Sequence, residues 1–165
     1  SMPITLAGRL TNEQQPADVA AIAGLWADRL AGFAKKPTIC LLGLAFKGIP
    51  ATDDLRGTMA YPIFRQLEQR FPDAKFRGYD AAVTRAAAEA FFGFKMVDGL
   101  PEAFEEADMV FILNNHSAFQ QMDLAALSGA MRRPGIVYDL WNLHDDITES
   151  MPDGVVALSL GNEML

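Results

Sequence analysis

The sequence predicts an α/β protein with a Rossmann-like parallel sheet, flanking helices and a preceding amino-terminal helix. Two observations support this fold class. Short uncharged runs at 38–42 and 109–113 have the composition of strands buried on both faces of a parallel sheet. These runs also alternate with segments of helical periodicity, and strands that alternate with helices form right-handed βαβ crossovers.

The first predicted element is a helix that begins at Pro16, because proline suits the first turn of a helix. Its apolar residues recur every three or four positions and would form one face: Val19, Ile22, Trp26, Leu30 and Phe33. The cations of Lys35 and Lys36 suit its last turn. We therefore divide the chain into a helical amino-terminal segment, residues 1–36, and an α/β domain, residues 37–165.

The rest of the chain follows in order as strands and helices. We expect strands at 38–42, 75–79, 94–97, 109–113, 135–138 and 154–158. We expect helices at 59–70, 83–92, 101–106 and 124–131. Thr58 is a candidate N-cap for the helix that follows it, because a threonine side chain can accept a bond from a first-turn amide.

Composition limits the class of function. Half of the 165 residues are hydrophobic and 21% are charged, which argues for a folded domain and against disorder. The net charge of −7 argues against nucleic acid or an anionic membrane as the partner. We see no signal peptide and no apolar run near the ~20 residues of a membrane span. With a single cysteine, the chain is expected to be cytoplasmic.

A polar loop after the first strand is the main candidate for a ligand site. It carries Lys47, Asp53, Asp54 and Arg56 between glycines, just before a predicted helix. Open α/β sheets bind ligands at the carboxyl ends of their strands, and cations beside a helix N-terminus suit a phosphate. We assign Lys47 to the ligand. Arg56 fits a ligand and a pairing with the adjacent carboxylates equally well, and we interpret the two aspartates as turn residues.

Two further loops are expected to leave the same edge of the sheet. Asn114, Asn115 and His116 can hydrogen-bond a base or a ribose, although capping of their own loop is the structural alternative. Trp141 and Asn142 follow a later strand, and the indole can stack on a base or sugar, or simply pack. All five are assigned to substrate binding. His116 is not expected to be catalytic, because no nucleophile accompanies it.

We predict neither a catalytic residue nor a metal site in this chain. Cys40 lies in the middle of a buried strand, where thiolate formation is disfavoured. Asp145 and Asp146, after His144, are interpreted as a solvated turn. The GxGxxG fingerprint of NAD-binding domains is absent from the sequence.

Several of these segments, taken in order, resemble a known family. GLAFK at 43–47 and DDLRG at 53–57 resemble the carboxy-terminal, nucleotide-sugar-binding domain of the UDP-glucose/GDP-mannose dehydrogenases. The resemblance continues through GYD at 78–80, AD at 107–108 and ILNNH at 112–116. It continues through YDLWN at 138–142 and ends near SLG at 159–161. It therefore covers most of the chain.

The resemblance implies a parent enzyme that uses NAD to oxidise the C6 alcohol of a nucleotide sugar to a carboxylate, through a cysteine thioester, in polysaccharide biosynthesis. It implies a UDP-sugar ligand, with Lys47 at its uridine and phosphate end and Arg56 toward the cofactor. It also implies partner domains, amino-terminal to this one, that carry the catalytic cysteine and the NAD fingerprint. A homodimer would form through a central region, and residues 1–36 would be the helical connector to that region. The chain alone would then bind without catalysing.

The sequence leaves two alternatives open. The chain could be a standalone nucleotide-binding or regulatory module with no dehydrogenase partner. It could also be a structural domain with a vestigial pocket, because many members of the family have an arginine where Trp141 stands.

Overall fold

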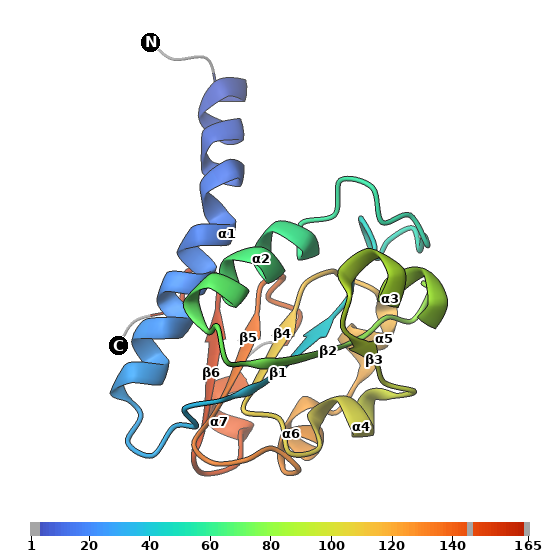
Figure 1. Ribbon diagram of the computed structural model, residues 1–165. Helices are drawn as coiled ribbons and strands as arrows, with labels where there is room; N and C mark the ends of the chain where they lie inside the picture. The colour runs from blue at the N-terminus through green and yellow to red at the C-terminus, as the bar shows by residue number, and fades with distance from the viewer. Residues whose placement is uncertain (1–3, 145–146, 164–165) are drawn as a thin grey trace.

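Within residues 4–144 and 147–163, which the computed structural model describes, six parallel strands form one sheet in the order β3-β2-β1-β4-β5-β6 (Figure 1). The strands are β1 (Thr38–Leu42), β2 (Lys75–Tyr79), β3 (Lys95–Met96), β4 (Met109–Ile112), β5 (Gly135–Asp139) and β6 (Val155–Ser159). The predicted Rossmann-like fold is confirmed. Each predicted strand is present, and β1 and β2 have the predicted bounds.

The central strands are buried on both faces of the sheet. In β1, Ile39 and Leu41 point into one core and Cys40 and Leu42 into the other, and all four side chains are fully buried. Successive side chains of a strand point to opposite faces, so a strand between two helical layers must be apolar throughout. This requirement explains why the uncharged runs of the sequence located the strands.

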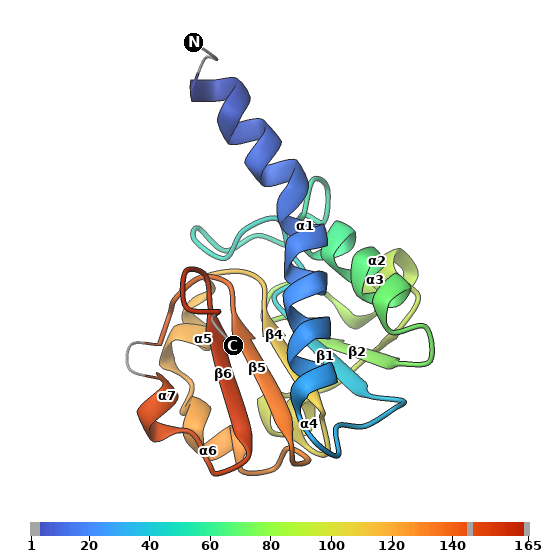
Figure 2. The ribbon, with the colours of Figure 1, turned by 90° about the vertical axis from the view of Figure 1, so that its left-hand side faces the viewer.

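Helices cover both faces of the sheet (Figure 2). One layer holds α1 (Ile4–Arg29), α2 (Ala60–Arg70) and α3 (Arg85–Phe92). The other holds α4 (Leu100–Phe104), α5 (Ser117–Gln121), α6 (Leu124–Ser128) and α7 (Ile147–Ser150). Two short helices, α5 and α7, were not predicted from the sequence. The N-cap position of α2 is held by Met59 and not by Thr58. The Thr58 hydroxyl still accepts a bond from the first helical amide, that of Ala60, at 3.1 Å.

The helix α1 differs from the prediction at both ends. It begins at Ile4 and contains Pro16 in its interior, so the expectation of a helix starting at this proline is wrong. Proline lacks an amide hydrogen and removes one helical bond, but the helix continues on both sides of it. The helix ends at Arg29, before the predicted lysines, and Gly32 adopts a left-handed φ of +84°. The amino-terminal end of α1 extends away from the sheet (Figures 1 and 2).

The buried face of α1 is also displaced from the predicted one. It is made mostly of small residues, and its members are Pro16, Val19, Ala20, Ala23, Gly24 and Ala27. The larger residues Ile22, Trp26, Leu30 and Phe33 are only partly buried and pack at its margin. Small side chains let α1 lie close to α2, where a Cβ on Gly24 would stand 2.2 Å from Nε of Arg70. Residues 19–27 therefore contribute to the same core as the sheet. Our division of the chain at residue 36 stays a prediction.

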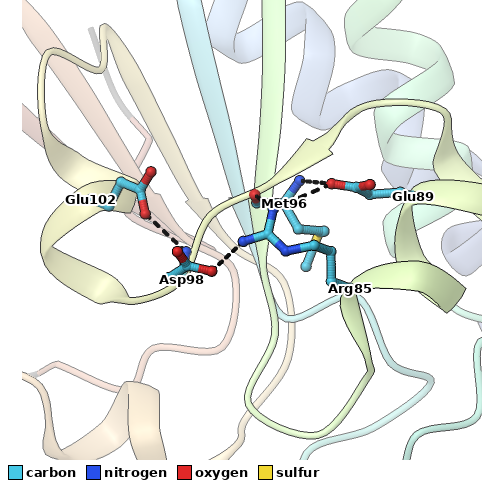
Figure 3. A network of polar contacts seen from close by, with 5 residues as sticks. All are labelled: Arg85, Glu89, Met96, Asp98 and Glu102. Carbon is cyan, nitrogen blue, oxygen red and sulfur yellow. Dashed lines mark hydrogen bonds and ion pairs between the residues drawn. The ribbon is translucent and has the colours of Figure 1, made fainter.

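A polar network holds the edge strand β3 (Figure 3). The guanidinium of Arg85 donates to the carbonyl of Met96 and pairs with Asp98 and Glu89. Glu89 also accepts from the Met96 amide at 3.0 Å, and the Asp98 amide donates to Oε2 of Glu102 at 2.9 Å. The two-residue strand is thereby fixed to α3 and α4 by side chains as well as by its bonds to β2.

Candidate functional site

The carboxyl ends of β1 and β4 meet at the point where the strand order reverses. Chain segments leave these two neighbouring strands in opposite directions, and ligands of open α/β sheets bind at such a point. Here the two loops touch. Gly43, at a left-handed φ of +87°, lies so close to Asn114 that a Cβ would stand 2.6 Å from Cγ of that side chain. Only glycine satisfies both the backbone angle and the contact.

A second contact joins the loop of Lys47 to the turn after β4. The Gly48 amide donates to Oδ1 of Asn115 at 3.1 Å. A Cβ on Gly48 would lie 2.0 Å from the His116 nitrogen, so the two backbones are in direct contact. Lys47 itself is exposed and stands between exposed Phe46 and buried Gly48. Lys47 is therefore adjacent in sequence to the point where its loop contacts Asn115 and His116.

Asn114 and His116 cap their own loop. Oδ1 of Asn114 accepts from the His116 amide at 3.1 Å. Nδ1 of His116 accepts from the Ala118 amide at 3.0 Å, at the start of α5, which leaves Nε2 as the protonated nitrogen of a neutral ring. The loop-capping interpretation is thus correct for these atoms. Asn114 is buried, whereas Asn115 and His116 are partly exposed. Nε2 of His116 and the Nδ2 group of Asn115 are therefore the groups that a ligand could engage.

Trp141 lies at the same edge, after β5. Its indole Nε1 donates to the carbonyl of Leu113 at 3.0 Å, and 47% of its surface is exposed. Asn142 follows it at a left-handed φ of +51°, and its side chain donates to the Leu160 carbonyl at 3.4 Å. Trp141 and Phe46 both line a hollow of about 480 Å³ whose floor is apolar. The other lining residues are Gln15, Met59, Ile63, Leu113, Leu140, Asn142 and Leu160.

Arg56 forms a two-pronged ion pair with Asp54. Nε and Nη2 of the arginine each lie 3.0 Å from a carboxylate oxygen. The hydrogen bonds from Arg56 lower the pKa of Asp54 to about 2. The guanidinium is otherwise exposed to solvent. An arginine held in this way keeps further donors for an anion, so the pairing predicted from the sequence is present without excluding a ligand role.

Two aspartates that directly follow predicted strands, Asp80 and Asp139, organise these loops. Asp139 is fully buried, and its carboxylate accepts from the amides of Trp141, Leu143 and His144. Asp80, at the end of β2, accepts from the amides of Leu44 and Ala45. An aspartate directly after a strand was the signal in the sequence. The hydrogen-bond partners of such an aspartate could not be predicted from the sequence, because Asp80 and Leu44 are 36 positions apart.

The described residues offer no sign of a redox or metal centre. Cys40 is fully buried, and burial raises the pKa of its thiol to about 12. Among residues 4–144 and 147–163, no three histidine, cysteine or carboxylate side chains are grouped as metal ligands. The same part of the chain holds no helix long and apolar enough to cross a membrane. The predicted turn at Asp145 and Asp146 lies outside the described residues.

The strand order and the polar loops gathered at its reversal define a Rossmann-like domain, a class in which ligands bind at the carboxyl ends of the strands where the order reverses. The chain belongs to the UDP-glucose/GDP-mannose dehydrogenase family, because residues 40–146 match the model of that family's UDP binding domain. The resemblance seen in the sequence is thereby confirmed.

Known relatives agree with this assignment. The chain is 32% identical over 106 residues to the UDP-glucose 6-dehydrogenase of Rhizobium meliloti (strain 1021), which covers 64% of this chain and 23% of that enzyme. It superposes on the UDP-N-acetyl-mannosamine dehydrogenase of S. aureus with a TM-score of 0.70 and 26% identity, over 94% of this chain and 32% of the other.

A third comparison shows the fold alone. The NDP-N-acetyl-D-galactosaminuronic acid dehydrogenase of Methanosarcina mazei Go1 gives a TM-score of 0.72 at 21% identity, over 98% of this chain and 32% of that one. The chain spans less than a third of the length of each of these three proteins.

Proposed function

We propose that this chain is the UDP-sugar-binding domain of an NAD-dependent nucleotide-sugar 6-dehydrogenase, which oxidises the C6 alcohol of the sugar to a carboxylate. The domain binds the nucleotide and does not catalyse by itself. The observation that supports this most is the bond between Gly48 and Asn115, which brings the loop of Lys47 onto the Asn115–His116 turn at the sheet's reversal point. Family membership supports the same ligand class.

In this proposal the side chains have separate tasks. Lys47 supplies the positive charge for the diphosphate, because it is exposed and free to reach a ligand at the edge. Asn115 and His116 offer neutral donors to the base or ribose. Trp141, half exposed beside an apolar hollow, offers a flat face for the base or sugar. Asn142 holds the loop of Trp141 in place through Leu160.

Arg56 faces the cofactor side in this proposal, and NAD and the catalytic cysteine belong to partner domains of the parent enzyme. The parent enzyme acts as a homodimer through a central region, in the cytoplasm. The domain boundary stays at residue 36, with α1 as the connector. Part of this connector, residues 19–27, packs on the domain that it joins.

Two experiments test the proposal at two levels. Calorimetric titration with UDP and UDP-glucose tests binding by the chain. Binding of neither ligand would contradict the proposed binding function. Reading the gene upstream of this chain for a GxGxxG loop and a cysteine loop tests the dehydrogenase assignment. UDP binding without those upstream segments would support the standalone regulatory module instead.

A further inference from the structure

The turn after β1 has two consecutive backbone amides that donate to a carboxylate of the protein itself. In dinucleotide-binding members of this architecture, the first βα turn presents its amides to the pyrophosphate. Here the turn is Gly43-Leu44-Ala45, and the start of α2 lies beside it, because the Thr58 hydroxyl contacts the Ala45 carbonyl at 3.4 Å. The parts of an anion-binding site are therefore present: a left-handed glycine, two consecutive amides and a neighbouring helix start. We call the position in front of the Leu44 and Ala45 amides the seat.

That seat is filled from inside the protein. Oδ2 of Asp80 accepts from the Leu44 amide at 2.7 Å and from the Ala45 amide at 3.1 Å. Leu44 and Ala45 are both buried, so their amides have no access to bulk water as an alternative partner. The other oxygen of the same carboxylate accepts from the amides of Ala82 and Val83 at 2.8 and 2.9 Å. One carboxylate thus satisfies four backbone donors.

We propose that Asp80 is a built-in substitute for a phosphate that determines how this domain selects its ligand. Its carboxylate occupies the amides that a dinucleotide pyrophosphate would use, and its charge repels a second anion from the same place. A nucleotide that binds at this edge must then be held by side chains such as Lys47. This inference rests on the proposed function only in taking that ligand to be a nucleotide.

Three substitutions separate the parts of this role. Asp80→Ala vacates the whole seat. Asp80→Ser keeps a short hydroxyl that can still serve the neighbouring Ala82 amide, but it is too short to bridge to Leu44. Asp80→Asn keeps the volume of the side chain and removes its charge, so it serves as the matched control in which the seat stays occupied. Its single acceptor oxygen can serve only one of the two amide pairs.

The test is an amide NMR titration of the whole chain with inorganic phosphate, NAD and UDP, read at Leu44 and Ala45. In the unmodified chain, both amides should be unaffected by all three. In Asp80→Ser and Asp80→Ala, phosphate should shift them and bind at least about tenfold more tightly, because two donors are freed. Asp80→Asn should show no such gain.

Three outcomes overturn the proposal. They are a phosphate or NAD shift of these amides in the unmodified chain, a folded Ala or Ser variant that gains no phosphate binding, and an equal gain in Asp80→Asn. If both seat-opening variants fail to fold, a phosphate shift of these amides in the unmodified chain, or a phosphate gain in Asp80→Asn, still overturns the proposal. Failure of UDP to bind anywhere would reject the proposed function while leaving the gain in Asp80→Ser as separate support for the filled seat.

Discussion

The amide of Gly48 donates to Oδ1 of Asn115 across 3.1 Å, and this bond joins two loops that leave neighbouring strands in opposite directions. Lys47 is therefore positioned by contact with the β4 loop and not only by its own strand. The arrangement has no room for a larger residue at Gly48, since a Cβ there would lie 2.5 Å from Cα of His116.

Gly48→Ala should consequently disturb both stability and binding. The nearest atoms are backbone atoms, which cannot move aside as a flexible side chain can, so we expect a loss of about 1–3 kcal/mol of unfolding free energy. UDP affinity should fall as well, because Lys47 moves with the loop. Urea unfolding and calorimetry measure the two effects. Gly99→Ala is the control, since a Cβ there meets nothing closer than 3.6 Å. Equal results for the two variants would contradict the contact.

The stability of the fold should decrease in alkaline solution. Burial raises the pKa of Tyr138 above its ordinary 10, and its bond to Glu163 acts in the same direction. Burial likewise raises the pKa of Cys40 from 9.0 to about 12. Both groups are stabilised in the protonated form. Their contribution is therefore full below the unfolded-state values and is lost as pH rises above them.

Urea unfolding at a series of pH values between about 8 and 11 measures this loss. The decrease should be smaller in Tyr138→Phe and in Cys40→Ala than in the unmodified chain. Tyr61→Phe removes the hydroxyl of a partly exposed tyrosine and serves as the control. Parallel pH profiles for all four proteins would show that neither buried group carries the effect.

The ion pair between Arg56 and Asp54 leads to a prediction for the pKa of Asp54. In Arg56→Ala, the pKa of Asp54 should return from about 2 toward its ordinary 3.8, because the two hydrogen bonds that favour the carboxylate are gone. Arg56→Lys keeps the charge but not the two-pronged geometry, so an intermediate value is expected. Carboxyl NMR titration measures both. An unchanged value in Arg56→Ala would mean that the pair does not form in solution.

Hydride chemistry should be absent from the isolated chain. Cys40 is fully buried and its thiol is held protonated, so it cannot serve as a nucleophile. Absorbance of NADH with UDP-glucose as substrate measures the rate, with Cys40→Ser as the control for any residual signal. Turnover by the pure chain that disappears in Cys40→Ser would overturn the view of this domain as a binding module.

The strands were predictable because burial on both faces leaves a direct mark on composition. The run 38–42 is uncharged, and the structure has the same bounds for β1. The helix α1 was mispredicted for two physical reasons. Pro16 was taken as a start although a long helix can contain it. The large residues were taken as the buried face although the buried positions of α1 are mostly small residues.

The edge that carries the candidate site was also predictable, since glycines and polar residues follow the strands 38–42 and 109–113. What each polar group binds could not be predicted. Asn114 and His116 bond within their own turn, and Asp80 bonds to a loop far away in sequence. Such partners depend on which strands become neighbours, and local sequence does not contain that information.

Calorimetric titration of UDP onto the unmodified chain and onto Lys47→Ala tests the central claim most directly. A charge-assisted contact to the diphosphate has a net value of about 1.5–3 kcal/mol, so Lys47→Ala should weaken binding by about one to two orders of magnitude. Lys36→Ala is the matched control, because it removes the same charge at the opposite end of β1 and should leave the affinity unchanged. Equal UDP affinity for the unmodified chain and Lys47→Ala would contradict the site.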